Sequence, residues 1–296
     1  MNNMSISASK ILVPIGFSVQ SMIALSQAFN LAKIKKSKVV LLSVVEEQSM
    51  MQSLFLDDKS HELQLKVNCK LKEIGIEYGE RYGVDVEILV AKGKVYEQIN
   101  EVAEMISADL IIMGTNGSGG KAKKIMGSNA ERVVRLAYCP VITIKGKSHR
   151  EGCKNIILPL DLEKQTKEKV TYALEYARYW NATIRLVSVV LRGNQDVREK
   201  LIKNINQVKK FITDADVKCT ADLVEGEKKQ SLGDFVFKYE KHFDADLIMI
   251  MTKKEELTLS NNISVTARYI INNSEIPVMS IRPKEKKHLT GPTTAF

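Results

Sequence analysis

Apolar residues follow two alternating patterns along the chain. Short apolar runs, such as residues 39–45 and 108–113, have the length and composition of buried strands. Between such runs, apolar residues recur with helical spacing, as Leu25, Ala28 and Ala32 do. Strands that alternate with amphipathic helices predict a parallel sheet covered by helices on both faces.

The same pattern occurs twice. Lys10-Ile-Leu-Val-Pro14 aligns with Asn155-Ile-Ile-Leu-Pro159 in the second half of the chain. Residues 108–111 match residues 245–248, and Pro140-Val141 matches Pro277-Val278 at the same offset. A repeat that spans nearly the whole chain indicates two related units rather than one large one.

We therefore expect an α/β protein with two tandem, doubly wound, five-stranded parallel-sheet domains. The repeat places the first domain at residues 1–147 and the second at residues 153–283. The polar tail at 284–296 is expected to be disordered.

A glycine-rich loop carries the candidate chemistry. Gly114 and Gly117 follow the apolar run at 108–113, and further along the loop Gly127-Ser128-Asn129 opens a helical pattern. A helix N-terminus offers unpaired N–H groups and a positive dipole end, which suit a phosphate group. The alternative interpretation is a solvated surface turn, and the place between a strand and a helix favours phosphate.

Two better-known phosphate loops do not fit this stretch. A P-loop requires glycine at Thr115 and Ser or Thr at Ala122. A dinucleotide fingerprint can be aligned with Gly117, Gly119 and Ala122, but no carboxylate follows at the expected distance.

Composition and charge limit the classes of protein and of binding site that the chain can represent. Among the 296 residues no apolar run has transmembrane length, and the start lacks the apolar core of a secretory signal, so we expect a cytoplasmic protein. The four cysteines lie far apart, without a Cys-x-x-Cys pair, so buried free thiols are expected. The four histidines show no ligand spacing, and we expect no metal site. The net charge of +9 comes from scattered lysines with 6% aromatic residues, which favours solvated faces and anion binding over nucleic-acid binding.

Taken together, these residues resemble the universal stress protein family in its tandem two-domain form. The resemblance is carried by Gly114-x2-Gly117-x9-Gly127-Ser128-Asn129, by Lys10–Pro14, and by Cys139-Pro140-Val141. It implies the adenine nucleotide alpha hydrolase-like fold, a role in the stress response, dimers, and ATP as ligand, with or without magnesium.

The resemblance also implies which residues bind ATP. In family members of this type, Pro14 and Ile15 flank the adenosine and Val44 contacts the base, while the glycine loop approaches the ribose and takes the phosphates on N–H groups. The implied site consists of Pro14, Ile15, Val44, Gly114, Asn116, Gly117, Gly127, Ser128 and Asn129.

One departure from the family pattern lies in the first half and several lie in the second. Gly16 stands where the family commonly has an aspartate, which removes a charged acceptor whose hydrogen bond contributes about 1.5–3 kcal/mol. The second half has Asp161 at that position, but Met251, Ser264 and Val265 replace the glycine-loop residues. We therefore expect ATP in the first half only.

Three functions remain for such a chain. The first is an ATP-binding sensor or regulator with at most slow hydrolysis, because no histidine or carboxylate stands at a matched catalytic position. The second is a nucleotide-independent scaffold in which Val141–Ile144 and Val278–Ile281 pair with each other or with a second chain. The third, an adenylylating enzyme, lacks the Ser-Gly-Gly-x-Asp-Ser loop that such chemistry uses.

Overall fold

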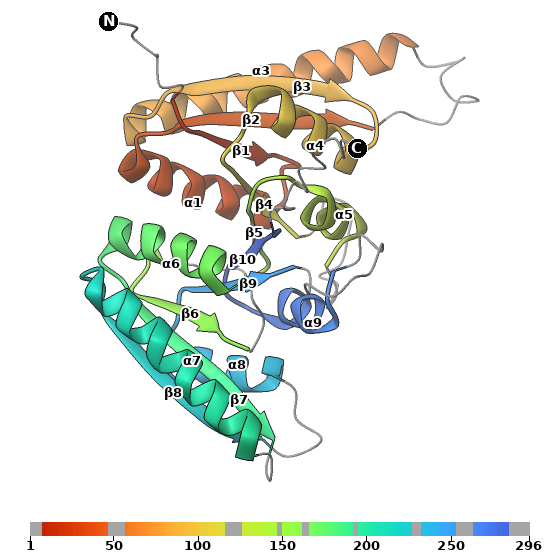
Figure 1. Cartoon of the computed structure of the whole chain (residues 1–296). Coiled ribbons are helices and arrows are strands. Elements are labelled where there is room, and N and C mark those ends of the chain that lie inside the picture. Colours follow the sequence, from red (N-terminus) through yellow and green to blue (C-terminus); the bar gives the residue numbers. More distant parts are fainter. Residues whose placement is uncertain are drawn as a thin grey trace, which may run out of the picture.

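The computed structural model describes residues 8–46, 57–115, 126–146, 150–161, 166–191, 195–226, 232–252 and 263–283. In these ranges the chain forms one ten-stranded sheet with helices on both faces (Figure 1). The strand order is β3-β2-β1-β4-β5-β10-β9-β6-β7-β8. The first half, from β1 to β5, and the second half, from β6 to β10, thus have the same internal order.

The elements of the first half follow the predicted alternation of strand and helix. They are β1 (Lys10–Pro14), α1 (Val19–Lys35), β2 (Lys38–Val45), α3 (Asp57–Tyr82), β3 (Val86–Lys92), α4 (Val95–Ile106), β4 (Leu110–Gly114), α5 (Ser128–Leu136) and β5 (Val141–Ile144).

The elements of the second half repeat this order. They are β6 (Asn155–Pro159), α6 (Thr166–Trp180), β7 (Thr183–Leu191), α7 (Gln195–Asp214), β8 (Cys219–Gly226), α8 (Leu232–His242), β9 (Leu247–Met251), α9 (Val265–Asn273) and β10 (Val278–Ile281). Within each half all paired strands are parallel.

The two halves are joined by one antiparallel pair, β5 with β10. Ile142 lies opposite Met279, which is its own equivalent in the repeat. The predicted edge strands therefore pair with each other, and the two expected five-stranded sheets are continuous. We call β5, β10 and the contacts that cross them the seam.

Two apolar layers hold this sheet. One layer lies between the sheet and α1, α3, α6 and α7, and it contains Phe29, Leu71 and Tyr176. The other lies between the sheet and α4, α5, α8 and α9, and it contains Ile99 and Val236. Each layer includes residues of both halves, so the apolar interior is continuous across the seam.

The expected burial of the cysteines is correct only in part. All four are free thiols, and Cys139 and Cys153 are buried. Cys69 is exposed on α3, and Cys219 is half-buried. The prediction for Cys69 was wrong because a helical pattern alone does not show which face of a 26-residue helix turns outward.

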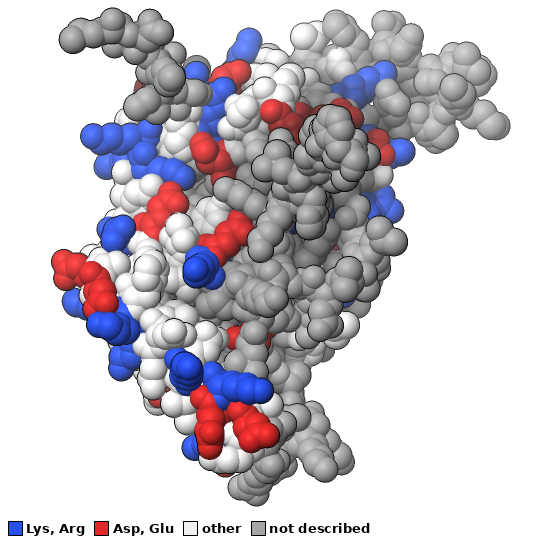
Figure 2. Space-filling model, viewed as in Figure 1, with Lys and Arg blue, Asp and Glu red and all other residues white. Residues whose placement is uncertain are grey.

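The surface carries charges of both signs. On the face drawn in Figure 2, Lys and Arg side chains lie beside Asp and Glu side chains instead of forming one basic patch. No helix in the described part of the chain is long and apolar enough to cross a membrane.

Candidate functional site

The winding of the first half reverses between β1 and β4, which are neighbours in the sheet. From β1 the chain continues to β2 on one side, and after β3 it returns to β4 on the other. Ligands of doubly wound sheets bind beyond the carboxyl ends of the strands at such a point. Pro14 and Ile15 lie at that end of β1, and Gly114 and Thr115 lie at that end of β4.

The turn after β1 is held by the neighbouring strand. The N–H of Ile15 donates to the carbonyl of Leu42 on β2 at 2.7 Å, and Ile15 is buried. Val44, which follows on the same strand β2, is half-buried at the same edge. The structure thus brings three of the predicted residues, Pro14, Ile15 and Val44, to one edge of the sheet.

Gly16 lies exposed beside this turn. A Cβ atom at Gly16 would have no heavy atom within 4 Å. Phe17, the next residue, has a left-handed backbone with a φ of 56° and is 40% exposed. A Cβ atom therefore has open space at this position, and the glycine is not required by close packing.

Gly114 is required by the helix that packs on it. A Cβ atom there would lie 2.9 Å from the carbonyl carbon of Gln20 and from the backbone nitrogen of Ser21. Both atoms belong to the first turn of α1, whose N-cap Ser18 accepts a hydrogen bond from the N–H of Ser21 at 3.2 Å. The sequence-based role of Gly114 was close approach of a ligand, and the close approach in the structure is that of α1.

The two ends of the glycine loop are tied together. The N–H of Gly127 donates to the carbonyl of Thr115 at 3.0 Å, and a Cβ atom at Gly127 would lie 2.9 Å from that oxygen. The helix α5 therefore begins directly beside the end of β4. The predicted residues Asn116 and Gly117 lie outside the described residues.

The N-terminus of α5 has a glycine cap. Gly127 is the N-cap residue, so no side chain of its own accepts from the first turn. Ser128 is exposed and Asn129 is half-buried, while Glu131 in the same turn forms an ion pair with Arg268 at 2.8 Å. A helix start without a capping side chain presents N–H groups and a partial positive charge to a ligand.

The equivalent helix of the second half is capped by its own side chain. Ser264 stands where the first half has Gly127, and its Oγ accepts from the N–H of Ala267 at 3.2 Å. Its N–H donates to the carbonyl of Thr252 at 2.8 Å, which matches the bond between Gly127 and Thr115. The two loops close in the same way, but the second has an internal acceptor at the place where a ligand would bind.

A buried lysine lies at the carboxyl end of β6. Lys169 on α6 is 6% exposed, and its Nζ donates to the carbonyl of Pro159, the equivalent of Pro14. In the first half the residue at this helix position is Ala24, which is fully buried. The sheet edge of the second half therefore contains a lysine side chain where the first half has a methyl group.

The sequence interpretation missed two residues of this region. Thr115, whose carbonyl accepts from Gly127, lies outside the predicted site, although the repeat aligns it with Thr252. Asn272 on α9 accepts from the N–H of Met126 at 3.0 Å through Oδ1, although the two residues lie in different halves of the chain. No local pattern points to such a contact, since it exists only when the two halves meet.

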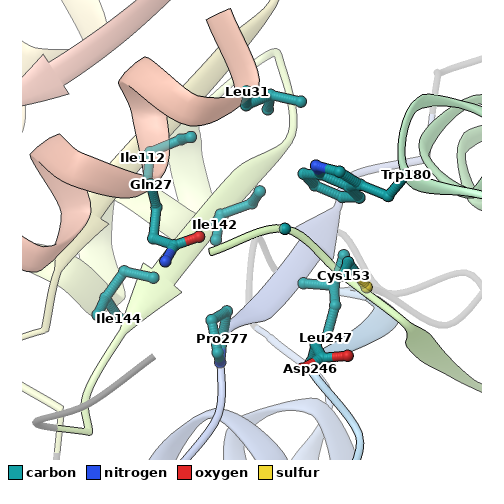
Figure 3. Close-up of a pocket in the computed structure, with 11 residues that line it drawn as sticks. Gln27, Leu31, Ile112, Ile142, Ile144, Cys153, Trp180, Asp246, Leu247 and Pro277 are labelled. Carbon is teal, nitrogen blue, oxygen red and sulfur yellow. The ribbon is translucent and has the colours of Figure 1, made fainter. Parts of the chain in front are cut away.

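A cavity of about 30 Å³ lies away from this edge, at the seam. Figure 3 shows Gln27 and Leu31 of α1 on one side of it and Trp180 of α6 on the other. A cavity of this size has room for about one water molecule, and small-molecule sites are about ten times larger. In the described residues no group of three or more His, Cys, Asp or Glu side chains is arranged to hold a metal ion.

Comparison with known proteins gives sequence matches that cover slightly less than half of the chain and a structural match that covers nearly all of it. The model of the Universal stress protein family matches residues 8–145. Universal stress protein MJ0531 of Methanocaldococcus jannaschii is 34% identical over 143 residues, which are 46% of this chain and 81% of that protein. Universal stress protein MJ0577 of the same organism is 30% identical over 162 residues, 49% of this chain and 99% of that protein.

A solved structure matches the fold of both halves together. The crystal structure of a universal stress protein from Archaeoglobus fulgidus DSM 4304 covers 92% of this chain and 98% of its own, with a TM-score of 0.73. At 18% identity this match concerns the fold alone.

Proposed function

Because the chain belongs to the universal stress protein family, we propose that its first half binds ATP and acts as a sensor or regulator. The observation that carries the proposal is the contrast between the two helix starts. Gly127 leaves the first turn of α5 without a capping side chain, while Ser264 caps α9. An anion can satisfy N–H groups in the first half that the second half satisfies internally.

In the proposed complex each end of the nucleotide meets a different part of the sheet edge. Gly127, Ser128 and Asn129 take the phosphates on N–H groups and on the Ser128 hydroxyl. Pro14, Ile15 and Val44 lie beside the adenosine, and Asn116 and Gly117 contribute from the loop. The half at residues 1–147 is the nucleotide domain, and the half at 153–283 is its unliganded counterpart.

The proposal includes one nucleotide for each chain. In the second half, Ser264 occupies the helix start, and the ammonium of Lys169 lies at the Pro159 carbonyl. The Ser264 hydroxyl supplies from within the protein the acceptor that a bound phosphate would supply from outside, and the Lys169 side chain fills space at the sheet edge. At most slow hydrolysis is expected, with magnesium as the counter-ion of the phosphates, because the sequence has no histidine or carboxylate at a matched catalytic position.

Calorimetric titration of magnesium-ATP into the whole chain tests this function. The expected result is one site per chain. Gly127→Val should abolish binding, because its Cβ would lie 2.9 Å from the Thr115 carbonyl and displace the start of α5. Ser264→Val, which introduces the same residue at the equivalent position of the second half, is the matched control and should leave ATP binding intact. Two sites per chain, or binding that survives Gly127→Val, would contradict the proposal.

A nucleotide-independent scaffold is the second candidate. The observation in its favour is the seam, which joins the two halves into a pseudo-dimer within one chain. Gly16 also favours the scaffold, because it replaces the carboxylate expected beside a nucleoside. The absence of any ATP binding at millimolar concentration, in protein freed of nucleotide, would favour the scaffold.

A further inference from the structure

Asn272, near the end of α9, reaches from the second half to the first. Its Oδ1 accepts a hydrogen bond from the N–H of Met126 at 3.0 Å. Met126 is 4% exposed and directly precedes Gly127, the N-cap of α5. A side chain of the second half therefore fixes the residue from which the proposed phosphate site begins.

Asn272 is itself held by the first half. The ammonium of Lys145, which follows β5, donates to the backbone carbonyl of Asn272. One turn earlier on α9, the guanidinium of Arg268 pairs with Glu131 of α5 at 2.8 Å. Both contacts run between the two halves, so the geometry of the hydrogen bond between Met126 and Asn272 depends on how the halves meet.

The contact runs in one direction only. The repeat aligns Asn272 with Arg135 and Met126 with Ile263, at the same offset that aligns Pro140 with Pro277. A guanidinium has donors and no acceptor, so Arg135 cannot accept from the N–H of Ile263. The second half can therefore support the loop of the first half through this hydrogen bond, and the reverse support is chemically excluded.

We propose that the second half is a built-in brace for the phosphate site of the first half, with Asn272 as its positioning residue. The inference rests on the proposed ATP site at Gly127, Ser128 and Asn129. A helix start that is fixed before the ligand arrives loses less freedom on binding, which strengthens the affinity. Linkage is reciprocal, so bound ATP also tightens the seam.

The first test compares two neighbouring asparagines of α9. Asn272→Ala removes the bond to Met126, whereas Asn273→Ala removes only a bond within the helix, from the Asn273 amide to the Tyr269 carbonyl. We expect the Kd for ATP to rise about 2- to 12-fold in Asn272→Ala and to stay unchanged in Asn273→Ala. The Kd for adenosine, which lacks phosphate, should stay unchanged in both.

The second measurement needs no ligand. Exchange of the Met126 amide hydrogen with solvent should be faster in Asn272→Ala than in the unmodified chain. Asn272→Asp keeps an acceptor at the same position and should restore the slow exchange.

The outcomes separate this inference from the function on which it rests. If the unmodified chain binds ATP and Asn272→Ala binds it equally well, the brace is refuted and the ATP site stands. Equal losses for ATP and adenosine would indicate general loosening and also overturn the brace. If the unmodified chain binds no ATP, the proposed function fails first, and a slow Met126 amide is then a packing contact without a ligand role.

Discussion

Replacing Gly16 with aspartate should strengthen nucleotide binding. Gly16 stands where the family commonly has a carboxylate beside the nucleoside, and a Cβ atom has open space at this position. A Cβ atom there meets no heavy atom within 4 Å, and the φ of Gly16 lies outside the left-handed region. The preceding residue, Ile15, is fixed by its hydrogen bond to Leu42, so the new side chain starts from a defined position.

The magnitude follows from the kind of bond that is added. A hydrogen bond to a charged acceptor contributes about 1.5–3 kcal/mol, which corresponds to roughly a 10- to 150-fold lower Kd. Repulsion between the new carboxylate and the phosphates reduces the gain for ATP, and salt screens that repulsion. Adenosine carries no phosphate and should gain at least as much as ATP.

Calorimetry on three variants separates the hydrogen bond from other effects. Gly16→Ala adds a side chain without an acceptor and should change the Kd little. Gly16→Asn adds a neutral acceptor and should lower the Kd about 2- to 12-fold. If Gly16→Asp binds adenosine no more tightly than Gly16→Ala, the nucleoside does not lie beside residue 16, and the reasoning fails.

Three other perturbations probe the fold around the site. Gly114→Ala should lower the free energy of unfolding by about 1–3 kcal/mol in urea denaturation, because its Cβ would lie 2.9 Å from the backbone of Gln20; an unchanged midpoint would show that α1 can move away. Burial raises the pKa of Glu240 to about 7 from 4.5, so ionisation of this carboxyl disfavours the folded state. The contribution of Glu240 to the free energy of unfolding is therefore complete below pH 4.5 and is lost as the pH rises through 7. Glu240→Gln should therefore raise the free energy of unfolding at pH 8 by about 1–2 kcal/mol, after allowance for partial exposure, and leave it unchanged at pH 4. Cys69 should react with a thiol reagent in the folded protein, while Cys139, whose pKa burial raises to about 12, should react only after unfolding; equal rates would contradict the burial.

The sequence predicts the repeated order of strands and helices because each element depends mainly on the residues within it. Periodicity within each helix and strand does not depend on distant contacts, so the two related halves can be recognised from the chain alone. The pairing of Val141–Ile144 with Val278–Ile281 was one of two alternatives, and the sheet selects the pairing within the chain. Local pattern therefore predicts the elements and a limited set of arrangements for them.

Contacts between distant segments account for what the sequence could not predict. Gly114 is a glycine because α1 packs against the end of β4, which no motif states. Asn272 is an ordinary helical polar residue until the two halves meet and its amide reaches Met126. Ser264 and Gly127 differ by one hydroxymethyl group, and only the structure shows that this group closes a helix start.

The order of synthesis gives the antiparallel pair β5–β10 a further consequence. β5 ends at Ile144, and its partner β10 ends at Ile281. The ribosome therefore synthesises nearly the whole second half between β5 and β10. At about 5–20 residues per second, the nascent first half spends roughly 7–27 s with an unpaired apolar edge. Unpaired edges associate with other chains. Growing chains are therefore most exposed to aggregation, or to capture by a chaperone, in the interval between the synthesis of β5 and the synthesis of β10.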